Sequence, residues 1–90
     1  MSNGFATGQV TVTTSPTYIT TGVVGMSRVY VHAPQGNNVI YLGNSTVSTT
    51  TGFEIVKNQV LEFWLPEGQE LYAIVNTATE PLIWMRSGGK

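Results

Sequence analysis

Short apolar segments separated by turn residues follow one another along this chain of 90 residues. The clearest alternation covers residues 26–33, in which valines occupy one face and Arg28, Tyr30 and His32 occupy the other. Successive side chains of a β-strand point to opposite faces, so this period of two predicts a strand with one buried and one exposed face. The exposed face would carry a polar strip that is available for contact.

Further apolar segments are bounded by the Gly, Pro, Asn and Ser residues that favour turns. They are residues 9–14, 18–19, 39–43, 53–56, 60–65, 69–76 and 82–86. None of these segments has the periodicity of an amphipathic helix. The pattern therefore predicts a single all-β domain, an antiparallel β-sandwich or jelly-roll-like barrel of about eight short strands.

Composition divides the chain into a domain and two short ends. Residues 9–86 form the predicted β-sandwich domain, and residues 87–90 form a short C-terminal tail. Residues 1–8 are small and polar apart from Phe5, which predicts a flexible N-terminal arm. Two interpretations of this arm stay open: a disordered terminus, or an arm whose Phe5 docks on a neighbouring subunit.

The composition also predicts self-association. Charged residues make up 10% of the chain and the net charge is −1, whereas about 25% of residues are charged in an average soluble domain. Cys is absent and His occurs once, so disulfides and a two-His metal site within one chain are excluded as supports for a small core. We therefore expect an oligomer.

Several partner classes are excluded by the same inventory. The four cations form no basic stripe, so we expect no nucleic-acid binding. No apolar run reaches the roughly 18 residues of a membrane helix, so we expect no membrane partner. The first residues lack the pattern of a signal peptide, and we expect a protein that is made and used without secretion.

Catalytic chemistry has few candidate groups in this sequence. With neither Cys nor Asp, the chain can form no Cys nucleophile and no triad completed by Asp. Glu62, Glu67 and Glu70 lie beside a turn or on outward strand positions, which favours solvated charge over a glycosidase pair. His32 could contribute to a metal shared at a threefold axis, but an ordinary strand histidine is the simpler interpretation. We expect no enzyme, no cofactor and no metal site.

Four segments together resemble a small β domain of tailed-bacteriophage virion proteins. They are residues 10–17 (VTVTTSPT), 40–43 (IYLG), 51–55 (TGFEI) and 67–74 (EGQELYAI). Their order and spacing carry the resemblance, because each segment alone is ordinary β-strand sequence. The resemblance implies a virion structural protein, often a trimer, of the capsid-decoration or head-fibre type.

Composition and resemblance together lead to a functional expectation. We expect a non-enzymatic capsid decoration protein that binds the major capsid protein as a homotrimer. It would be made in the host cytoplasm and would lie on the capsid surface of the virion. The candidate interface residues are aromatic, Met and polar-strip positions together with the arm: Phe5, Arg28, Tyr30, His32, Trp64, Trp84 and Met85.

Two alternatives remain at this point. The domain could be another minor structural module of a phage, in a head fibre, neck or tail. It could also be a carbohydrate-binding β-sandwich in which exposed aromatic side chains such as Trp64 stack on the sugar rings of a surface glycan.

Overall fold

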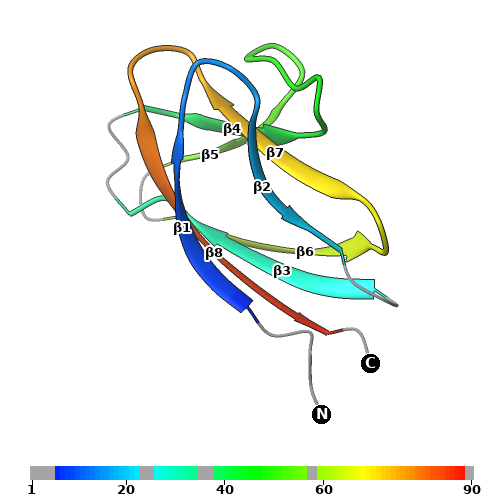
Figure 1. Ribbon diagram of the computed structural model, residues 1–90. Coiled ribbons are helices and arrows are strands. Elements are labelled where there is room, and N and C mark those ends of the chain that lie inside the picture. Colours follow the sequence, from blue (N-terminus) through cyan, green and yellow to red (C-terminus); the bar gives the residue numbers. More distant parts are fainter. Residues whose placement is uncertain (1–5, 23–25, 35–37, 57–58, 89–90) are drawn as a thin grey trace.

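A computed structural model describes residues 6–22, 26–34, 38–56 and 59–88. These residues form eight strands joined by turns and loops, without a helix in the described ranges (Figure 1). The strands are β1 (Ala6–Val12), β2 (Thr17–Thr21), β3 (Met26–His32), β4 (Ile40–Gly43), β5 (Phe53–Ile55), β6 (Val60–Pro66), β7 (Glu70–Val75) and β8 (Glu80–Gly88). The predicted all-β fold with about eight strands is confirmed.

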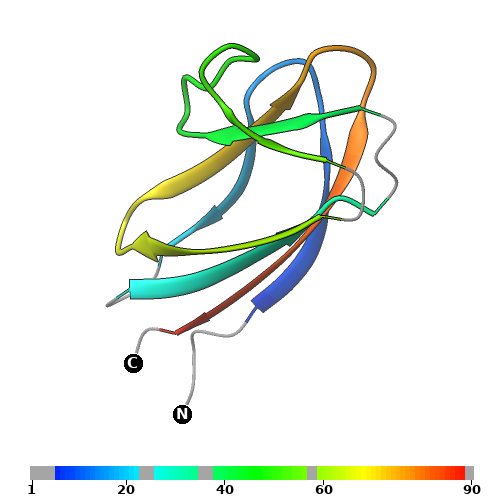
Figure 2. The same ribbon diagram turned by 180° about the vertical axis from the view of Figure 1, so that it is seen from behind.

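The strands form two four-stranded antiparallel sheets that pack as a sandwich (Figures 1 and 2). Sheet A has the order β1-β8-β3-β6, and sheet B has the order β2-β7-β4-β5. The first strand pairs with the last, the second with the seventh, the third with the sixth and the fourth with the fifth. This nesting is a long antiparallel hairpin rolled into two sheets, which is the jelly-roll arrangement.

The core lies between the two sheets and is built from the inward rows of the strands. On β3, Val29 and Val31 are fully buried, while Arg28, Tyr30 and His32 point outward and stay partly exposed. The alternation in the sequence therefore corresponds to the two faces of the strand. Sheet B contributes equally buried side chains to the core: Ile40, Leu42, Ile55, Leu71, Ala73 and Val75.

Polar side chains tie distant segments together around this core. The Arg86 guanidinium on β8 donates hydrogen bonds of 2.9 Å to the Thr20 hydroxyl and to the Thr21 carbonyl oxygen, so it links sheet A to β2 of sheet B. Glu80 begins β8 with a buried carboxylate, which accepts a 3.1 Å hydrogen bond from the Asn38 backbone N–H. Buried polar groups are costly without such partners.

Both ends of the domain extend further than the apolar pattern indicates. β1 begins at Ala6, so residues 6–8 of the expected arm are strand residues, and β8 continues to Gly88. The reason is pairing: Ala6 lies opposite Arg86 and Gly8 lies opposite Trp84. Backbone hydrogen bonds hold small polar residues in a strand when a neighbouring strand offers the partners.

Candidate functional site

The outer face of sheet A gathers aromatic, aliphatic and charged side chains from three neighbouring strands. The register places Tyr30 between Met85 and Glu62, and His32 between Ile83 and Val60. Arg28 lies opposite Trp64. We call the following set the outer patch: Arg28, Tyr30, His32, Val60, Trp64, Ile83 and Met85.

Large apolar side chains of the outer patch are open to solvent. Val60 is 61% exposed, Trp64 is 52% exposed and Ile83 is 40% exposed. A shallow hollow of about 270 Å³ lies among Tyr30, His32, Val60, Ile83 and neighbouring side chains. Val60 and Ile83 line this hollow together, and exposed apolar side chains grouped in this way are typical of surfaces that contact a partner.

Arg28, the charged residue of the outer patch, is paired with Glu62 on the same face of sheet A. The Arg28 Nε atom lies 3.1 Å from the Glu62 Oε2 atom, and the guanidinium lies over the Trp64 ring at 4.7 Å from its centroid. The Tyr30 side chain, first by a hydrogen bond and then by its charge, and the Glu62 carboxylate raise the pKa of Arg28. The Arg28 guanidinium covers one face of the indole, which leaves that face closed to a stacking sugar.

Five of the seven predicted interface residues meet in the outer patch: Arg28, Tyr30, His32, Trp64 and Met85. Trp84 is not among them, because its position on β8 alternates with Ile83 and Met85 and its ring packs against the core beside Gly8. Phe5 lies outside the described residues. Val60 and Ile83 join the patch without having been candidates, and their outward positions in the strand alternation were the available signal.

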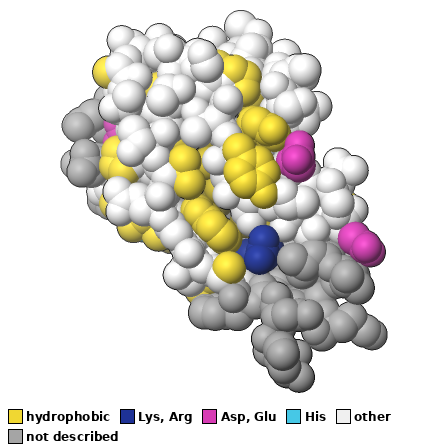
Figure 3. All heavy atoms as spheres, viewed as in Figure 1, with side chains coloured by type: hydrophobic (Ala, Val, Ile, Leu, Met, Phe, Trp, Pro, Cys, Tyr) yellow, Lys and Arg dark blue, Asp and Glu magenta, His cyan; other side chains and the backbone are white. Residues whose placement is uncertain are grey.

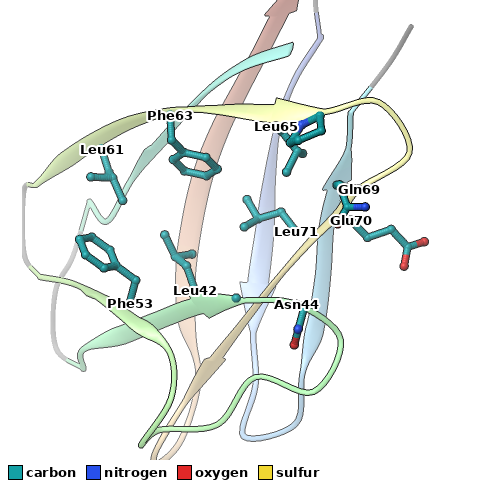
Figure 4. A pocket seen from close by; sticks show the side chains of 11 residues that line it. Leu42, Asn44, Phe53, Leu61, Phe63, Leu65, Gln69, Glu70 and Leu71 are labelled. Atoms are coloured by element: carbon teal, nitrogen blue, oxygen red, sulfur yellow. The ribbon is translucent and has the colours of Figure 1, made fainter. Parts of the chain in front are cut away.

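An apolar groove opens on the side of the sandwich where the edge strands β5 and β6 lie (Figure 4). Its volume is about 600 Å³, within the range of roughly 300–1,000 Å³ of many ligand sites. Figure 4 shows Phe53, Leu61 and Phe63 at one end, and Gln69, Glu70 and Asn44 toward the other. Phe53 is 62% exposed. The sequence does not reveal this groove, because only the sheet topology shows that β5 and β6 are edge strands of the two sheets.

The outer face of sheet B carries an aromatic pair. The rings of Tyr18 and Tyr72 meet edge to face, with centroids 5.7 Å apart. Removal from water, and secondly the negative charge of Glu70, raises the pKa of Tyr72. The face of the molecule seen in Figure 3 carries only a few charged side chains among uncharged ones, in keeping with the low charge of the sequence.

Groups capable of metal or acid-base chemistry are dispersed. Among the residues that the structure describes, no three His, Cys, Asp or Glu side chains come together as a metal site. His32 lies between Val60 and Ile83 on the sheet. Within the described residues there is no helix that is long and apolar enough to cross a membrane.

Comparisons with known proteins give a likeness of fold alone. A scan against protein-family models finds no matching family, and a search of curated proteins finds no match. Among solved structures, the chain is similar to the plu4264 protein from Photorhabdus luminescens, with a TM-score of 0.56 and 13% sequence identity. The likeness covers 98% of this chain and 66% of that one, so this chain spans just under two thirds of the other's length. At this identity the likeness bears on the β-sandwich and not on activity.

Proposed function

We propose that this protein is a non-enzymatic structural protein of a tailed-bacteriophage virion. In this proposal it is a capsid decoration protein that binds the major capsid protein on the outer surface of the head. The observation that carries the proposal is the outer patch, where Trp64, Ile83 and Val60 are exposed on one face of sheet A. The resemblance of four sequence segments to phage virion domains supplies the class of partner.

The chemistry of the outer patch suits a protein partner. Interfaces are enriched in aromatic residues, Met and Arg, and their central charges must be paired when water is removed. Trp64, Tyr30 and Met85 provide the first kind of side chain, and the Arg28–Glu62 pair already satisfies the second condition. Burying this face in an interface therefore removes apolar area from water without leaving a buried charge unpaired.

Binding of this kind stabilises a shell by mass action. A ligand that binds only the assembled shell stabilises it by RT ln(1 + [L]/Kd) at each site. With many equivalent sites on one head, a modest affinity at each site adds to a large resistance against internal genome pressure.

The test uses binding to purified heads that lack the protein. Ile83 lies on β8, an inner strand of sheet A, and is 40% exposed, so Ile83→Lys places a charge within the outer patch. We expect its affinity in a co-sedimentation assay to fall at least about 30-fold, which corresponds to the roughly 2 kcal/mol of an interface hot spot.

The matched control is Tyr18→Lys, because Tyr18 is 47% exposed but lies on sheet B, away from the outer patch. Full binding by Ile83→Lys would contradict the proposal. Cryo-microscopy of the parent particle distinguishes the possible locations. Density on the head surface supports decoration. Density only in a head fibre, the neck or the tail would contradict decoration and support the alternative of another minor structural module. Saturable glycan binding that is lost in Trp64→Ala would favour the carbohydrate-binding alternative.

The homotrimer expected from the sequence stays a prediction. Light scattering of the purified protein measures it directly, and nothing within the described ranges marks a threefold contact.

A further inference from the structure

We propose that β6 pairs edge to edge with β6 of a second copy of this chain. The pairing is antiparallel about a twofold axis and joins two copies of sheet A into one continuous sheet. The proposal rests on the position and sequence of β6 and is independent of the proposed virion function. It predicts a dimer in place of the homotrimer expected from the sequence.

β6 is an edge strand of sheet A, and no further strand of the described residues pairs with its outer edge. Its seven residues pair with β3 on one side, and it is the last strand of sheet A. Natural edge strands are usually protected by charges, bulges, short length or proline. On β6 the single charge, Glu62, is neutralised by Arg28, and Pro66 occupies only the final position.

The other edge of sheet A shows the contrast. β1 is equally long, but its solvent-facing residues Thr7, Gln9 and Thr11 are polar. β6 instead carries Val60 and Trp64 on its outer face and three apolar side chains on its inner face. Apolar side chains on both faces of a free edge favour burial against another strand.

The inner row of β6 is a palindrome, which suits pairing with itself. It reads Leu61, Phe63 and Leu65, so an antiparallel register centred on Phe63 places Phe63 opposite its own copy and Leu61 opposite Leu65 of the second copy. Directly opposed aromatic and aliphatic side chains stabilise antiparallel pairs. These side chains also line the groove, so the apolar walls of the two grooves become continuous.

The outer row of β6 is complementary in charge in the same register. Glu62 comes to lie opposite Trp64 of the second copy, whose indole is already covered by Arg28 of that copy. Each Arg28 would then have a carboxylate on both sides, its own Glu62 at 3.1 Å and Glu62 of the second copy across the new pair. An isologous contact requires this kind of self-complementarity.

Disulfide trapping tests the register cleanly because the chain has no cysteine. In the proposed register, positions 62 and 64 are directly opposite, with Cβ atoms roughly 5 Å apart, whereas position 62 is diagonal to its own copy at about 7–8 Å. A disulfide requires Cβ atoms within about 4.5 Å, so only the opposed pair can close with a small adjustment. We expect an equimolar mixture of Glu62→Cys and Trp64→Cys to cross-link on oxidation far faster than either variant alone.

A mixture of Glu62→Cys with Thr11→Cys is the matched control, because Thr11 is exposed on the opposite edge of the sheet. Failure of the 62/64 mixture to exceed this control would overturn the proposed register. Faster cross-linking of Glu62→Cys with itself would also overturn it.

Light scattering gives the second test, with an expected mass of twice the monomer's 9.7 kDa. Trp64→Glu places a second carboxylate opposite Glu62 of the other copy, and we expect this variant to be a monomer. The double variant Trp64→Glu with Glu62→Lys places opposite charges at these positions, and we expect it to restore the dimer. Ile83→Lys, on a central strand, is expected to remain a dimer even where it loses binding to heads. A monomer or a trimer for the unaltered protein at 100 µM, about a hundredfold above a micromolar Kd, would overturn the edge pairing.

Discussion

At the scale of single residues, Gly22 allows two segments of the backbone to approach closely. Its N–H donates a 2.9 Å hydrogen bond to the Gln69 carbonyl oxygen, and its own carbonyl oxygen accepts one of 3.0 Å from Gly68. A Cβ atom at Gly22 would lie 2.1 Å from the Pro66 carbonyl oxygen. Gly68 meets a different requirement, since its φ of 80° is a left-handed conformation in open space.

These two glycines predict different costs for the same substitution. Gly22→Ala is expected to destabilise the fold by about 2 kcal/mol or more, because backbone must move to admit the methyl group. Gly68→Ala is expected to cost about 1 kcal/mol, from conformation alone, and Gly68→Asn less, since Asn tolerates the left-handed region. Urea unfolding followed by tryptophan fluorescence measures all three, and equal stability of Gly22→Ala and the unaltered chain would contradict the steric argument.

The alternation of residues predicted correctly which face of β3 each side chain occupies. Arg28, Tyr30 and His32 were expected on one face and lie there. Val47 went unrecognised as a core contact. It is the single apolar residue of a Ser/Thr tract, yet it is 5% exposed and packs close to Gly43 and Gly52. A turn that folds back over a sheet is not visible in local periodicity.

At the scale of elements, the Arg86 side chain of sheet A is hydrogen-bonded to β2 of sheet B. Arg86 on β8 donates two hydrogen bonds to β2, one of them to the buried Thr20 hydroxyl. β2 has only β7 as a sheet neighbour, so this contact holds a sheet edge in place. The sequence placed Arg86 at the end of a strand, but its partners lie about 65 residues earlier in the chain.

Loss of this link is therefore expected to loosen β2. We expect Arg86→Ala to reduce the free energy of unfolding by about 2–3 kcal/mol, because hydrogen bonds to a charged donor are worth more than neutral ones. Arg86→Lys should recover part of the loss, since a single ammonium cannot match the geometry of the guanidinium. Thermal unfolding measures the stability, and hydrogen exchange should show faster exchange confined to β2. Unchanged protection of β2 in Arg86→Ala would refute the assignment.

At the scale of the whole molecule, the nested topology sets the order of closure. β4 and β5 are joined by residues 44–52, whereas β1 and β8 lie near the two ends of the chain. Loop-closure entropy rises with the length of chain enclosed, so the inner pair forms at a lower entropic cost than the outer pair.

Matched Leu→Ala changes on the inner and outer strands test this order. Leu42 on β4 and Leu82 on β8 are both buried, so each truncation should cost about 2–5 kcal/mol. We expect Leu42→Ala mainly to slow folding and Leu82→Ala mainly to speed unfolding. Stopped-flow kinetics over a range of denaturant concentrations separate the two rates, and the reverse pattern would show that the termini pair first.

The sequence by itself determined the class of fold, the face of each strand on which a side chain lies and the low content of charged residues. These are local properties, because the period of two follows from the covalent geometry of an extended chain and composition needs no structure. Only the tertiary structure decided which strands are neighbours, and thus that Arg28, Trp64 and Ile83 share one surface while Trp84 faces the core. It also decided that β6 is a free edge beside an apolar groove. Pairing joins residues far apart in the chain, so their contacts arise from long-range packing that no local pattern encodes.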